Sequence, residues 1–173
     1  MISIRRGIIA AVTATAFAIA GAAGLASAQA APASAEIVTK HRLPSVAVKW
    51  AAAWNGSDAQ KFAGLYVKQG SRYTDHAFGA TYTDRAGIAT WFGNTKAFLQ
   101  SGEVKVTGAF ADCDMVSISW TFSGHVAGAP KPFTVPAVTV LQLRNNEIVT
   151  NDDYYNLRDL LVQSGLPADM VLG

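Results

Sequence analysis

Cysteine is almost absent from this sequence, which has a single one, Cys113, in 173 residues. One thiol cannot form an intramolecular disulfide and is not a metal site by itself, which excludes a disulfide scaffold or a cysteine-rich zinc module. The predicted state of Cys113 is a small buried hydrophobe. We expect the functional site to hold no metal and no cofactor.

Charge is also scarce, and beyond the N-terminus it is balanced. Charged residues make up 15% of the chain, and two of the 14 basic residues are Arg5 and Arg6. The other 12 equal the 12 acidic residues in number. Because contacts from Lys and Arg to phosphates dominate nucleic-acid binding, we expect no nucleic-acid partner.

Long apolar runs are missing except at the N-terminus, where GIIAAVTATAFAIAGAAGLA follows Arg5 and Arg6. Its length also fits a transmembrane anchor. Its Ala and Gly content and the A-x-A sites ending at Ala28 and Ala30 favour a cleaved secretory signal peptide. The predicted mature protein is periplasmic or extracellular, without membrane contact after signal removal. The expected organisation is a signal peptide over 1–30, a flexible lead-in over 31–42, one domain over 43–167 and a tail over 168–173.

Helical periodicity marks the first half of the domain. The first predicted helix begins near residue 44 and carries the apolar stripe Val46, Trp50 and Trp54. A second, short helix is predicted to open with a capping box formed by Ser57 and Gln60. The third helix has the clearest period, with the stripe Ile88, Trp91, Phe92, Thr95, Phe98 and Leu99.

After Gly102 the period of apolar residues changes to two, which predicts strands. The cleanest is VSISWTFSG, in which apolar residues alternate with Ser and Thr. Turns are predicted at ADCD and at Asn145–Asn146, and a short closing helix ends at Gly165. Helices followed by long antiparallel strands are typical of an α+β fold. The helices then cover one face of a curved sheet and leave a ligand cavity between them.

Five segments carry a resemblance to a known family. In chain order they are WAAAWNGSDAQKFAGLY, YTDHAFG, DRAGIATWF, VSISWTFSG and EIVTNDDYYNLRDLLVQSGLP. From about Leu43 to Pro167 the chain resembles the nuclear-transport-factor-2-like superfamily, in its SnoaL-like polyketide cyclase branch. The resemblance implies a cone-shaped barrel of a strongly curved, mostly antiparallel sheet wrapped around about three helices. It also implies an enclosed pocket and, in many members, a homodimer.

The same fold hosts many chemistries, so function depends on the residues of the site. In the ketosteroid isomerase relative, Asp75 falls at the general-base position. Trp50 and Pro136 fall where that relative has its two oxyanion donors, and they do not supply that pair, so steroid isomerisation is not expected. Epoxide hydrolysis is not expected either, because the central strand has no charge. The cyclase branch relies chiefly on an Asp of the last strand, which here is Asp153.

Asp153 and Asp75 are therefore the predicted catalytic acid/base residues, and each has an alternative. A carboxyl group in an apolar pocket has a raised pKa, which favours proton transfer near neutral pH. Asp75 also fits a turn-forming Asp that bonds its own downstream backbone. Asp152 and Asp153 point to opposite faces of a strand, and only the resemblance favours Asp153 as the inward one. The predicted substrate-binding residues are Tyr73, His76, Trp50, Trp54, Trp91, Trp120 and Tyr155.

Three functions remain open at this point. In the first, the chain is an exported, cofactor-free proton-transfer catalyst that acts on a small, largely apolar carbonyl compound. In the second, it binds a small hydrophobic ligand without any reaction. In either function, the predicted tryptophans line the pocket or are simply part of the hydrophobic core. A protein-interaction module, including a homodimer, is the third reading and requires an exposed apolar patch.

Overall fold

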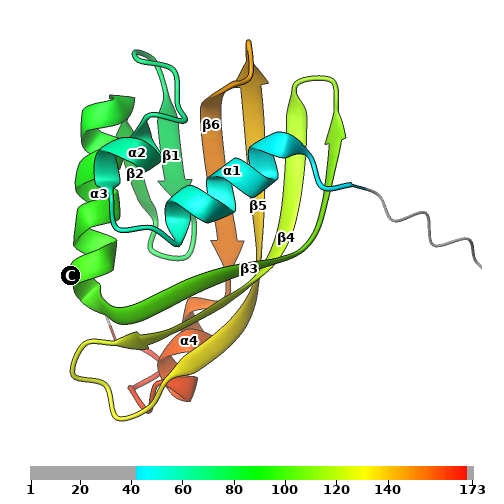
Figure 1. Ribbon diagram of the computed structural model, residues 1–173. Coiled ribbons are helices and arrows are strands. Elements are labelled where there is room, and N and C mark those ends of the chain that lie inside the picture. The colour runs from blue at the N-terminus through cyan, green and yellow to red at the C-terminus, as the bar shows by residue number, and fades with distance from the viewer. Residues whose placement is uncertain (1–41, 171–173) are drawn as a thin grey trace, which may run out of the picture. The chain divides into compact units, whose positions relative to one another are not determined.

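The computed structural model describes residues 42–170 (Figure 1). The predicted signal peptide and the lead-in as far as residue 41 lie outside this range. Within it, no helix is both long enough and apolar enough to cross a membrane. The helices are α1 (Ser45–Trp54), α2 (Ala59–Ala63), α3 (Asp84–Phe98) and α4 (Leu157–Gln163). The strands are β1 (Arg72–Asp75), β2 (Ala80–Thr83), β3 (Leu99–Asp112), β4 (Met115–Val126), β5 (Phe133–Arg144) and β6 (Glu147–Tyr155).

The six strands form one curved sheet in the order β2-β1-β6-β5-β4-β3. Neighbouring strands are antiparallel except for β1 and β6, which run parallel. Strands β2 and β3 each have a neighbour on one side only, so the sheet curls without closing. Figure 1 shows α1 and α2 over one face of the sheet, α3 beside its β2 edge, and α4 beside the end of β5. The predicted α+β cone is confirmed.

Strand alternation builds the core as the sequence predicts. Along β4, Val116, Ile118, Trp120 and Phe122 are buried, whereas the residues between them are more exposed. They pack against aromatic side chains of the first three helices, in a cluster that includes Trp54. The Trp54 ring lies 5.4 Å from that of Phe122, edge to face, a favourable aromatic geometry.

Both predicted hairpin turns are present, and the first corrects the expectation for Cys113. Cys113 is exposed, not buried, because it occupies the left-handed turn position between β3 and β4 with φ 52°. Asn145 and Asn146 join β5 to β6 with φ 52° and 65°, as a two-residue turn of this kind requires.

Two further expectations need correction. The N-cap of α2 is Asp58 and not Ser57, since its Oδ1 accepts hydrogen bonds from the backbone N–H groups of Gln60 and Lys61 at 2.9 and 3.0 Å. Pro136, placed by the resemblance at an oxyanion position, is exposed on the outer face of β5. The pocket therefore receives no group from that residue.

Candidate functional site

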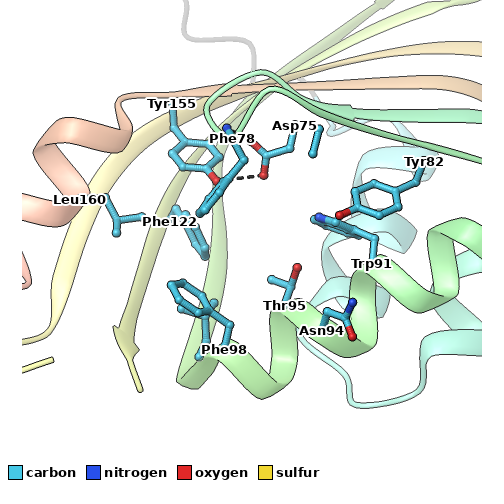
Figure 2. Close-up of a pocket in the computed structure, with 12 residues that line it drawn as sticks. Asp75, Phe78, Tyr82, Trp91, Asn94, Thr95, Phe98, Phe122, Tyr155 and Leu160 are labelled. Carbon is cyan, nitrogen blue, oxygen red and sulfur yellow. Dashed lines mark hydrogen bonds between the residues drawn. The ribbon is translucent and has the colours of Figure 1, made fainter. Parts of the chain in front are cut away.

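A cavity of about 410 Å³ lies between α3, the β1–β2 turn and the inner faces of β4 and β6. Leu160 of α4 closes part of its wall. Figure 2 shows the side chains that converge on this space. No Lys, Arg or His is among the residues that line this cavity of the described chain. The aromatic residues of its wall are Phe78, Tyr82, Trp91, Phe98, Phe122 and Tyr155.

Asp75 supplies the carboxylate of the cavity wall. It ends β1, and its Oδ1 accepts hydrogen bonds from the backbone N–H groups of Ala77 and Phe78, both at 3.1 Å. Its Oδ2 accepts a hydrogen bond of 2.9 Å from the hydroxyl of Tyr155 (Figure 2). One oxygen of Asp75 therefore shapes the turn, and the residue also lines the cavity, while its catalytic role stays a prediction.

Burial is the main influence on the pKa of this carboxyl group. Asp75 is only 4% exposed. Burial raises the pKa of its carboxyl above the ordinary value, and the donors from Phe78, Tyr155 and Ala77 offset part of that rise. Burial and the Asp75 charge raise the pKa of Tyr155, so its phenol stays protonated and acts as a donor. The arrangement holds a carboxylate against a largely apolar space, and within residues 42–170 no cationic side chain forms an ion pair with it.

Polar groups of α3 reach the same space. Asn94 and Thr95 line the cavity from α3, on the side away from Asp75 (Figure 2). The hydroxyl of Tyr82 comes from β2. A ligand between these groups would meet a carboxylate at one end and neutral hydrogen-bonding groups at the other.

Asp153 faces inward but lies in the core, not on the cavity wall. It is 2% exposed and is absent from the lining residues. Its Oδ1 accepts hydrogen bonds from Thr139 Oγ1 and Asn151 Nδ2, both at 2.6 Å. Its Oδ2 accepts one of 2.5 Å from the hydroxyl of Tyr73. Burial raises the pKa of Asp153 to about 6 against the opposing effect of these three donors.

The remaining predicted polar residue, His76, lies outside the cavity. Its Nε2 is 2.9 Å from Asp152 Oδ1, and its ring stacks on Tyr154 with centroids 4.2 Å apart. Asp152 also lies 3.6 Å from the guanidinium of Arg72. The side chain of His76 is 41% exposed, so this cluster belongs to the outer face of the sheet.

Of the four predicted tryptophans, only Trp91 lines the cavity. Trp50, Trp54 and Trp120 are buried in the core. Tyr73 lies behind the wall, with its ring centroid 3.8 Å from that of Trp91. Tyr155, from the last strand, lines the cavity.

Sequence reasoning missed Asn94, Thr95, Tyr82 and the two phenylalanines Phe78 and Phe98 as wall residues. One signal was present, since Thr95 is the only polar residue in the apolar stripe of the third helix. A polar residue on an otherwise buried helix face indicates a cavity beside it. The other four carry no comparable signal, because nothing in the sequence says that the β1–β2 turn folds toward α3.

The open, curved six-stranded sheet with its helices has a ketosteroid isomerase-like fold. Residues 47–151 match the family model described as SnoaL-like domain. That span exceeds half of the chain, and the chain belongs to this family. The resemblance stated from the sequence is confirmed to this extent. None of the curated proteins compared matches the chain.

Solved structures show the same fold. One similar structure is a hypothetical protein with a ketosteroid isomerase-like fold from Catenulispora acidiphila DSM 44928, in complex with trimethylamine. It is 41% identical, with a TM-score of 0.73, over 75% of this chain and 98% of that one. A putative SnoaL-like polyketide cyclase from Shewanella putrefaciens CN-32 is 18% identical, with a TM-score of 0.63, over 72% and 98% of the two chains. IdmH, a putative polyketide cyclase from Streptomyces antibioticus, is 18% identical, with a TM-score of 0.61, over 70% and 96%.

Proposed function

We propose that the chain binds a small, largely apolar molecule that carries one cationic alkylammonium group, with the carboxylate of Asp75 as its counter-charge. The observation that carries this proposal is a buried carboxylate on the wall of an aromatic cavity that has no cationic side chain. An alkylammonium group suits both features. Its charge is attracted by the carboxylate and by the faces of aromatic rings, and its methyl groups bury apolar surface.

The 41% identical relative supports this ligand class, because its structure contains trimethylamine. The cavity of about 410 Å³ is large enough for a ligand bigger than trimethylamine itself. The Asn94 and Thr95 side chains then provide hydrogen bonds for a second polar group of such a ligand.

Binding of choline, compared with its neutral isostere 3,3-dimethyl-1-butanol, tests the proposal by calorimetry. We expect choline to bind more tightly, and Asp75→Asn to weaken choline binding about tenfold or more while sparing the alcohol. Asp152→Asn is the matched control, since it removes an equal charge from the outer face. Equal choline affinity in Asp75→Asn and wild type contradicts the proposal.

Proton transfer from carbon is the second candidate function. Asp75 favours it because burial raises the pKa of its carboxyl, while Tyr155 and two backbone N–H groups hold its position. A base placed in this way removes a proton alpha to a carbonyl, and the Asn94 or Thr95 side chain then hydrogen-bonds the developing oxyanion.

5-Nitrobenzisoxazole tests the base directly. Removal of its C3 proton breaks the N–O bond and releases a coloured phenolate, and the base keeps the proton. We expect wild type to catalyse the ring opening above the rate of buffer, and Asp75→Asn to lose about 10²-fold or more of that activity. Retention of the activity in Asp75→Asn rules out Asp75 as the base.

Export is part of the proposed function and rests on the sequence of residues 1–30. A chain exported through a cleaved signal peptide has a mature N-terminus just after Ala28 or Ala30. Intact-mass measurement of the protein recovered from outside the cytoplasm of a bacterial host checks this. A full-length mass, with the initial Met and Arg5–Arg6 retained, contradicts cleavage.

A further inference from the structure

Asp75 and Asp153 are direct neighbours across the parallel β1–β6 pair. Both side chains face inward and are buried, at 4% and 2% exposure. Like charges directly opposite each other on a sheet are destabilising. Each of these two carboxyls feels the low dielectric of the interior, which strengthens their interaction. The pair is therefore costly for the fold unless a positive charge offsets it.

Among the described residues no cationic side chain forms an ion pair with either carboxylate, and His76 has only a minor effect, lowering the pKa of Asp75. Among residues 42–170 the ion pairs are Arg72–Asp152, His76–Asp152 and Arg85–Glu147, and none includes either carboxylate of the pair. His76 follows Asp75 in the chain, but its ring contacts Asp152 on the outer face. Apart from His76, the titratable groups close to the pair are phenols, namely Tyr73, Tyr155 and Tyr66. The phenol of Tyr82 lines the same cavity as Asp75.

The hydrogen bonds around Asp153 are oriented for its ionised form. The Oδ1 of Asn151 accepts from Trp50 Nε1 and from the Tyr66 hydroxyl, both at 3.0 Å, which leaves its NH₂ group to donate to Asp153. Trp120 Nε1 donates to Thr139 Oγ1 at 3.0 Å, and the Thr139 hydroxyl donates to Asp153.

Tyr73 donates to the other oxygen of Asp153, so all three of its partners are donors. An added proton on the carboxyl would leave one of these donors without an acceptor, an unfavourable state in a buried site. The network thus favours the ionised carboxylate behind the cavity wall and offsets part of the rise in pKa that burial causes.

We infer that Asp153 is a positioning residue for the proposed cation. Its buried charge acts through the neighbouring Asp75 and strengthens the binding of a cation in the cavity. The Asp153 side chain itself does not reach the cavity. This inference rests on the proposed function. The ligand cation provides the positive charge that the pair lacks, and a proton competes with it. The affinity for a permanently charged ligand therefore rises with pH as the pair loses its last proton.

Calorimetric titration of the full chain with choline between pH 5.5 and 7.5 tests the inference. We expect wild type to bind choline about threefold more tightly at pH 7.5 than at pH 5.5, because Asp153, with a pKa of about 6, is already partly ionised at pH 5.5 and the coupling amounts to about one pK unit. Asp153→Asn is expected to bind about tenfold more weakly than wild type at pH 7.5 and to show a flat profile over this range. Its affinity for 3,3-dimethyl-1-butanol, which has no charge, is expected to stay unchanged.

Tyr73→Phe provides a second variant that keeps the ring against Trp91 and removes one donor to Asp153. With one donor fewer, Asp153 holds its proton more tightly, so the midpoint of the choline profile is expected to move to higher pH.

A choline profile that is unchanged in both variants overturns the role of Asp153. Equal loss of choline and of the neutral alcohol in Asp153→Asn also overturns it, since a purely structural defect has that effect. Failure of wild type to bind choline at any pH instead refutes the proposed function itself, and the inference with it.

Discussion

At the residue scale, Asp75 and Asp153 are adjacent in the sheet but differ in what they contact. Both are buried, as a pocket carboxylate requires, but only Asp75 lines the cavity. The alternation rule placed Asp152 and Asp153 on opposite faces, and the structure puts Asp153 inside. Asn151 lies two residues before Asp153 on the same strand face, whereas the donors Tyr73 and Thr139 come from two other strands, which the sequence does not place beside it.

The raised pKa of Asp153 predicts that the stability of the fold depends on pH. Burial raises its pKa to about 6 in the folded state, from 3.8. The folded protein therefore binds this proton more tightly than the unfolded chain does. The resulting stabilisation is complete below pH 3.8 and is lost as pH rises through 6, a difference on the order of 3 kcal/mol.

Urea unfolding of wild type and Asp153→Asn at pH 4.5 and 7.5 measures this contribution. We expect the free energy of unfolding of wild type to fall more between the two pH values than that of the variant. An identical change in the free energy of unfolding of both proteins would show that Asp153 does not titrate between pH 4.5 and pH 7.5.

At the element scale, secondary structure followed from periodicity, whereas the bending of the sheet did not. The starts of α1 and of the strand VSISWTFSG were predicted from apolar spacing. The curl of β3 over β4 depends on paired glycines, Gly102 and Gly124, which are cross-strand neighbours. A Cβ at Gly124 would lie 2.5 Å from the Ser101 carbonyl oxygen and 3.0 Å from the Phe133 ring, so the strands can approach only without one.

Gly124→Ala is therefore expected to lower the free energy of unfolding by about 1–3 kcal/mol through overpacking. Gly93→Ala is the control, because Gly93 lies within α3 with no atom near its missing Cβ. That change is expected to raise the free energy of unfolding by about 0.5–1 kcal/mol. Chemical denaturation of both variants measures the two effects, and a neutral Gly124→Ala would contradict the packing argument.

At the scale of the whole molecule, the family resemblance predicted the cone and a pocket within it. The position of the pocket was not predictable from periodicity, since its wall combines a turn, two helices and several strands distant in sequence. The predicted homodimer stays a prediction. The outer face of the sheet does expose apolar side chains that a second copy would cover, namely Phe110, Val138 and Tyr154.

Asp75 is the proposed counter-charge for a cation in the cavity. The most direct test of this proposal is an NMR titration of the Asp75 carboxyl carbon in the mature protein, with and without saturating choline. Because a bound cation favours the ionised carboxylate, we expect choline to lower the pKa of Asp75 from its raised value. A titration curve that choline leaves unchanged would contradict the claim.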